Sequence, residues 1–158
     1  MTGLGSELVE RVGIIGLGRM GGAIAQRMVA EQRTVFGWTR SGRAVDSVES
    51  AADLETLVAK TDVLILSLFD DAAVTEILDS LLQLDLTGKL IIETSTISPA
   101  VLKDRIDEIT TRGATAVDAP ISGGPELVLA GSCGVFIGGD DGSFGGFGQN
   151  VLDIDPPF

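Results

Sequence analysis

The chain has 158 residues, of which 44% are hydrophobic, and this suits one folded domain with its own core. Its net charge of −12 argues against nucleic acid or an anionic membrane as a partner, because phosphates are held by lysine and arginine. The absence of histidine excludes histidine-dependent catalytic triads and histidine metal sites, and we expect no bound metal. The single cysteine, Cys133, cannot form an internal disulfide. With no recognisable signal peptide or membrane span, we expect a cytoplasmic protein.

Strands and helices are expected to alternate along the chain. The pattern predicts strands at residues 11–15, 34–38, 62–68, 90–93, 115–118 and 133–137. It predicts helices at residues 20–31, 54–60, from about 70 to 84 and 98–112, the last beginning at a capping serine followed by proline. Residues 44–52 fit either a short strand or a frayed helix, 119–124 a loop and 126–129 a helical turn. This alternation predicts a single α/β domain with a Rossmann-type, doubly wound, mostly parallel sheet.

Residues 12–21 read VGIIGLGRMG, an apolar strand that ends in Gly16-x-Gly18-x-x-Gly21 where a helix begins. Gly16 permits a tight turn, Gly18 lets a pyrophosphate approach the backbone, and Gly21 lets the helix pack closely on the strand. The free N–H groups at the positive end of that helix would face the phosphates. A glycine-rich turn without a ligand is the alternative, and the strand–turn–helix context favours a dinucleotide site.

The stretch after the second strand indicates which dinucleotide. A cofactor with a free ribose 2′-hydroxyl usually meets an acid about 20 residues beyond the glycine turn, here at Trp38 or Thr39. Residues 32–45 contain no acid. They contain three arginines and two hydroxyl side chains near the turn: Arg33, Arg40, Arg43, Thr39 and Ser41. Arginine binds phosphate through paired N–H bonds and stacks on adenine, so we expect NADP rather than NAD. A solvated basic turn is the alternative.

The motifs GLGRMG, WTRS, LSLF, ETSTISP and DAPISGG follow in an order that resembles the β-hydroxyacid dehydrogenases. These include 3-hydroxyisobutyrate and tartronate semialdehyde dehydrogenases, within the wider 6-phosphogluconate dehydrogenase group. The resemblance implies a lead at residues 1–10, an NAD(P)-binding domain at 11–141 and an atypical glycine-rich tail at 142–158. It implies that the pyrophosphate is held by Gly16, Leu17, Gly18, Arg19 and Met20.

The resemblance also implies roles for the later motifs. Thr39, Arg40 and Ser41 would hold the 2′-phosphate, and the positive charge of the turn adds the nearby Arg43 to this site. Leu68 and Phe69 would lie along the cofactor near the nicotinamide, although Phe69 stands where relatives have proline, and Thr96 would lie near the nicotinamide ribose. The substrate carboxylate would be bound by Ser122, Gly123 and Gly124. A hydroxyl and glycine N–H groups suit an anion cradle, and a plain turn is the alternative.

The expected function is hydride transfer between NADP(H) and a small β-hydroxyacid or its semialdehyde. In the resembling family a lysine in G-x-G-x-x-x-K moves the hydroxyl proton, but here Leu152 stands at the lysine position after Gly146 and Gly148. Asp118 is a possible proton carrier but reads better as a structural residue. We therefore assign no catalytic residue, and expect the helical second domain to be absent. Alternatives are a non-catalytic NADP-binding module or fragment, and an imine reductase or 6-phosphogluconate dehydrogenase-like enzyme. Imine reductases usually lack the DAPISGG loop. An incomplete chain would expose apolar surface, which predicts a homo-oligomer or another partner.

Overall fold

The computed structural model describes residues 10–135. Most of the expected lead, the whole glycine-rich tail with Leu152, and residues 136–137 of the last expected strand lie outside the described residues. Within residues 10–135, every helix is too short or too polar to cross a bilayer.

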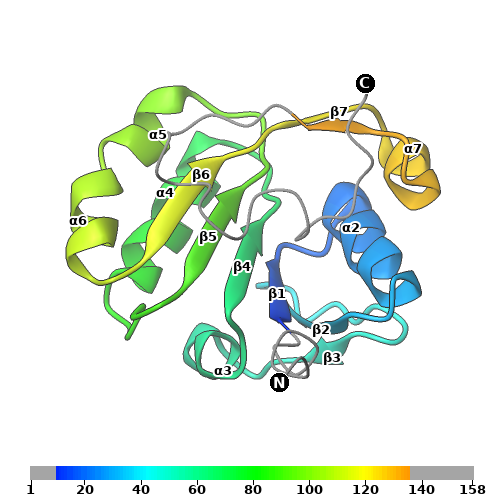
Figure 1. The fold of residues 1–158 in the computed structure, drawn as a ribbon, viewed down its shortest axis with the longest axis horizontal. Helices are drawn as coiled ribbons and strands as arrows, with labels where there is room; N and C mark the ends of the chain where they lie inside the picture. The colour runs from blue at the N-terminus through cyan, green and yellow to red at the C-terminus, as the bar shows by residue number, and fades with distance from the viewer. Residues whose placement is uncertain (1–9, 136–158) are drawn as a thin grey trace, which may run out of the picture.

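A parallel sheet of six strands forms the centre of the described part (Figure 1). Its strands are β1 (Arg11–Ile15), β2 (Thr34–Trp38), β3 (Glu49–Ser50), β4 (Val63–Leu66), β5 (Leu90–Glu93) and β6 (Thr115–Asp118). They lie in the order β3-β2-β1-β4-β5-β6, and every neighbouring pair is parallel. The chain therefore winds outward in both directions from β1 and β4. This confirms the predicted doubly wound α/β fold.

Helices cover both faces of the sheet. One face carries α2 (Arg19–Ala30) and α7 (Pro125–Ala130). The other carries α3 (Leu54–Lys60), α4 (Asp71–Leu81), α5 (Pro99–Lys103) and α6 (Ile106–Thr111). Side chains alternate along each strand, so that Ile14 and Ile65 pack on the α2 face and Ile15 and Leu64 on the opposite face. Cover on both sides explains why the strands read as continuous apolar runs.

The helix predicted at residues 98–112 is wrong as a single element, because the structure divides it into α5 and α6. The break lies at Arg105, whose backbone N–H bonds the Leu102 carbonyl three residues back, 3.0 Å away. The Arg105 side chain donates to the Val101 carbonyl (Nη1–O 3.0 Å) and to Asp79 on α4 (Nε–Oδ1 2.8 Å). Contacts with another helix therefore fix the break. Ser98 precedes α5 as expected, but its hydroxyl makes no capping bond.

The end of the described chain also differs from the prediction. The expected loop at residues 119–124 contains a short strand, β7 (Ile121–Ser122), which pairs antiparallel with β8 (Gly134–Val135). Between them α7 ends at Gly131, whose φ of +71° reverses the chain. The described part of the strand expected at residues 133–137 thus forms a separate ribbon, outside the parallel sheet. Smaller differences are that β4 ends at Leu66 and α2 begins at Arg19.

Two glycines bring α2 against the end of β1. Gly16 has a φ of +97°, and a Cβ at this position would lie 2.2 Å from the Ser67 carbonyl oxygen. A Cβ on Gly21 would lie 1.8 Å from the Gly16 carbonyl oxygen. Both obstacles are backbone atoms, which cannot move aside as a side chain can. The next residue, Gly22, has only the Leu17 carbonyl oxygen near, at 3.9 Å.

These two adjacent glycines give a matched test of the packing. We expect Gly21→Ala to lower the free energy of unfolding by about 2 kcal/mol or more, because the methyl group forces α2 away from β1. Gly22→Ala should be neutral or stabilising by up to about 1 kcal/mol, because alanine favours a helix. Urea denaturation of both variants checks this. Equal effects of the two substitutions would contradict the close contact.

Candidate functional site

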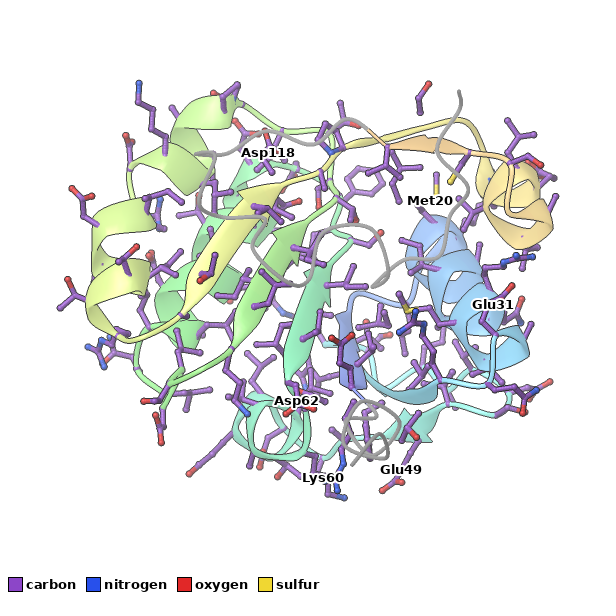
Figure 2. The ribbon with its side chains drawn as sticks, viewed as in Figure 1. Met20, Glu31, Glu49, Lys60, Asp62 and Asp118 are labelled. Carbon is purple, nitrogen blue, oxygen red and sulfur yellow. The ribbon has the colours of Figure 1, made fainter. Side chains whose placement is uncertain are left out.

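A pocket of about 360 Å³ opens where β1, β2 and β4 end. In doubly wound sheets, ligands bind at this edge, beside the point where the strand order turns. Its lining comes from the turn after β1, the segment after β2, the segment after β4 and the first two turns of α4: Gly16, Trp38, Thr39, Arg40, Leu68, Phe69, Asp70, Ala72, Ala73, Glu76 and Ile77. Figure 2 shows the two ends of the sheet. Met20, at the start of α2, and Asp118, at the end of β6, lie toward one end, and Glu49, Lys60 and Asp62 lie toward the other.

The turn between β1 and α2 has the shape that a pyrophosphate requires. Gly18 is the residue before α2, it is exposed, and a Cβ there would have nothing within 4 Å. The first turn of α2 contains no acid, so its free N–H groups keep their full positive potential. Leu17 is 2% exposed and packs on Gly37, so only its backbone can face a ligand. The residues around this turn therefore fit a bound dinucleotide.

The segment after β2 brings only part of the predicted 2′-phosphate site to the pocket. Thr39 and Arg40 line the pocket, whereas Ser41 and Arg43 are exposed outside its lining. Arg40 forms an ion pair with Glu76 of α4, with Nη2 and Oε1 2.5 Å apart. The hydrogen bond between them raises the pKa of the Arg40 guanidinium and lowers the pKa of the Glu76 carboxyl. Arg40 therefore lines the pocket with its guanidinium already paired with the carboxylate of Glu76.

The segment after β4 forms another side of the pocket. Leu68 is held there because its N–H donates to the hydroxyl of Ser95, two residues beyond β5, with N and Oγ 2.8 Å apart. Phe69 is 97% exposed, an unusual position for an aromatic ring. Thr96 follows Ser95 and is also exposed, but outside the pocket lining. The predicted nicotinamide residues thus lie on two neighbouring segments joined by the bond between Leu68 and Ser95.

The predicted carboxylate loop lies beside the start of α2 instead of in the pocket. Ser122 is exposed at the end of β7, Gly123 has a φ of +116°, and Gly124 immediately precedes α7. Helix α7 packs on α2, where Arg19 Nη2 lies 4.0 Å from Glu126 Oε1 and Arg27 Nη1 donates to the Leu129 carbonyl at 3.4 Å. The loop is therefore tied to α2, the helix that begins directly after Gly18.

Comparison with known families agrees with this geometry. Residues 11–152 match the family described as the NAD binding domain of 6-phosphogluconate dehydrogenase. The chain belongs to this family. The match confirms the resemblance to this family, while the role of each site residue stays a prediction.

The family relatives include oxidoreductases of known and unknown substrate. An uncharacterized oxidoreductase of Mycobacterium tuberculosis is 31% identical over 141 residues, which are 85% of this chain and 48% of that protein. Rat mitochondrial 3-hydroxyisobutyrate dehydrogenase is 28% identical, over 89% of this chain and 47% of the rat enzyme. Mycobacterium tuberculosis 3-hydroxyisobutyrate dehydrogenase, solved with L-serine, superposes with a TM-score of 0.85 at 24% identity, over 95% of this chain and 53% of that one. Structures of similar fold include complexes with NADP+ and with NAD+. The chain spans about half the length of the curated relatives it matches.

Three acids at or near this family site were not among the predicted site residues. Asp70 and Glu76 line the pocket, and the sequence signal for them was their position at the start of the helix that follows β4. The third, Glu93, ends β5 and is 0% exposed. Its Oε1 accepts the Ser95 N–H, and its Oε2 has no hydrogen-bond partner. An acid that ends an apolar strand was the available signal.

Burial is the main influence on Glu93. The loss of water around the charged form raises the pKa of Glu93 to about 7, and the nearby Asp118, its neighbour in the register of β5 and β6, acts in the same direction. Burial also raises the pKa of Asp118. Glu93 therefore holds its proton in the folded protein at pH values where the unfolded chain has released it. Ser95 contacts both Glu93 and Leu68, so Glu93 is connected to the pocket wall through this residue.

The titration of Glu93 predicts how stability depends on pH. The folded pKa of about 7 lies above the ordinary value of 4.5, so the contribution of Glu93 to stability is full below pH 4.5 and is lost as pH rises to about 7. Glu93→Gln removes this dependence. We expect its free energy of unfolding, relative to the unsubstituted protein, to rise by about 2–3 kcal/mol between pH 4.5 and 8. Urea denaturation of both proteins across this range measures it, and a constant difference would contradict the assignment.

Proposed function

We propose that this chain binds NADP(H) and serves as the cofactor-binding unit of an oxidoreductase for small β-hydroxyacids. The observation that carries the proposal is the open position of Gly18 at the start of α2, beside a pocket that contains Arg40. The first-turn N–H groups of α2 would hold the pyrophosphate, and Arg40 with Thr39 would hold the 2′-phosphate. Leu68, Phe69 and Thr96 would lie toward the nicotinamide.

When bound, the cofactor supplies hydride donation or acceptance. The residues of this chain orient it and would hold the substrate, a small carboxylate, at Ser122, Gly123 and Gly124 through a hydroxyl and backbone N–H groups. The similar Mycobacterium tuberculosis enzyme was solved with L-serine, a small β-hydroxyacid, and the rat relative is named for 3-hydroxyisobutyrate. L-serine and 3-hydroxyisobutyrate both belong to the proposed substrate class.

A non-catalytic NADP-binding module is the second candidate. It is favoured by one observation: among residues 10–135 the site offers no lysine, and the chain contains no histidine or tyrosine, to move the hydroxyl proton. Oxidation of small β-hydroxyacids by the NADP+-loaded protein would favour the enzyme. Binding of NADP(H) without turnover would favour the non-catalytic module. Turnover of imines or 6-phosphogluconate instead would point to those related enzyme classes.

Two further expectations accompany the proposal. A cytoplasmic location stays a prediction from the single cysteine. Self-association, or a partner, through exposed apolar surface also stays a prediction. Phe69, Leu127 and Leu129 are the large hydrophobic side chains exposed in the described part of the chain.

Cofactor preference can be measured through Trp38, the only tryptophan of the chain, which lines the pocket. We expect NADPH to quench its fluorescence with an affinity about tenfold or more above that of NADH, because a charge-assisted bond to the 2′-phosphate adds to binding. Arg40→Gln should remove most of this preference and leave NADH binding nearly unchanged. If NADH binds as tightly as NADPH and Arg40→Gln changes neither, Arg40 does not hold the 2′-phosphate.

A further inference from the structure

The ion pair between Arg40 and Glu76 connects the segment after β2 with α4 across the pocket lining. Arg40 Nη2 and Glu76 Oε1 are 2.5 Å apart, and both residues line the pocket. The two side chains are 69% and 59% exposed. A pair in water has little net stability, so it can open when a better partner for Arg40 arrives. The guanidinium proposed to bind phosphate is thus occupied by a carboxylate of the same chain.

The charges of the pocket lining make this occupation important. Arg40 is the only cation among the lining residues, and Asp70 and Glu76 are the acids. Asp70 is engaged elsewhere, because its Oδ1 accepts the Ala73 N–H, 2.8 Å away, at the start of α4. Glu76 is therefore the acid that a 2′-phosphate would meet at Arg40. A phosphate monoester carries a charge of about −1.5 to −2 at neutral pH, whereas a ribose 2′-hydroxyl carries none.

We propose that Glu76 sets the cofactor preference of this site by competing with the 2′-phosphate for Arg40. The inference rests on the proposed function, which places that phosphate at Arg40. Binding of NADP(H) then requires Glu76 to release the guanidinium and to tolerate a like charge nearby. Binding of NAD(H) leaves the ion pair in place. Glu76 thus lowers the affinity for the phosphorylated cofactor alone, and is a specificity-determining residue on a helix distant in sequence from the glycine turn.

A second effect of Glu76 acts in the opposite direction and is smaller. By binding Arg40, Glu76 also holds that side chain at the pocket, and its removal would leave Arg40 more rotamers to lose on binding. The competition is lost at the same time, together with the repulsion between the carboxylate and a phosphate that carries more than one charge. Because both side chains are exposed, the pair restrains Arg40 only weakly, and we expect the loss of competition and repulsion to outweigh the loss of ordering.

The experiment compares NADPH and NADH affinities, measured by Trp38 fluorescence, in the unsubstituted protein and in two variants. Glu76→Gln removes the competing charge and keeps the side-chain shape. Asp79→Asn is the matched control, since Asp79 lies on the same helix, is 58% exposed and pairs with Arg105, but does not line the pocket. We expect Glu76→Gln to tighten NADPH by about three- to tenfold and NADH by less than about twofold. Asp79→Asn should change neither.

The ratio of NADPH to NADH affinity decides the result. A higher ratio in Glu76→Gln than in the unsubstituted protein supports the inference, even if the unsubstituted protein has no preference. An unchanged or lower ratio overturns it. Arg40→Gln separates this failure from failure of the proposed function. If Arg40→Gln loses the NADPH preference while Glu76→Gln leaves the ratio unchanged, the 2′-phosphate binds at Arg40 and Glu76 plays no part. If neither Glu76→Gln nor Arg40→Gln alters the ratio, both the inference and the NADP assignment fail.

Discussion

The start of α2 lies so close to the end of β1 that neither Gly16 nor Gly21 has room for a side chain. This backbone contact sets where the helix begins and therefore where its unpaired N–H groups point. Between the two glycines, Gly18 faces open space. The same short segment is thus tightly packed at Gly16 and Gly21 and open at Gly18. The other parts of the proposed site lie around this glycine turn.

The parallel sheet brings the remaining parts to this position. Strands β2 and β4 flank β1 and run parallel to it, so the segments that follow them begin beside the glycine turn. One provides Arg40 and the other leads into α4, which provides Glu76. In a chain with a net charge of −12, a single arginine in the pocket lining does not by itself make a phosphate site. Whether Arg40 can bind a phosphate depends on the acids around it, and here Glu76 is bound to it directly.

The sequence was a good guide to elements buried on both faces. The predicted strands at residues 11–15, 34–38, 90–93 and 115–118 have the observed bounds, because their apolar residues are buried between the two helix layers. The break at Arg105 could not be predicted, since it depends on Asp79 of another helix. The pairing of Glu76 with Arg40 depends in the same way on a contact between α4 and the segment after β2. Local pattern contains no information about such contacts. Neither does it show that Glu93 is buried without a partner for one oxygen.

The most direct test of this account is dinucleotide binding by Gly18→Asp. Aspartate is a favourable residue before a helix, and a Cβ at this position meets nothing within 4 Å, so stability should stay the same or rise slightly. Its carboxylate would stand where the pyrophosphate is proposed to bind. The account predicts that NADPH and NADH both lose affinity, by more than about tenfold, in a variant that unfolds at the same urea concentration or a higher one. Unchanged binding of either dinucleotide would contradict the placement of the pyrophosphate at the start of α2.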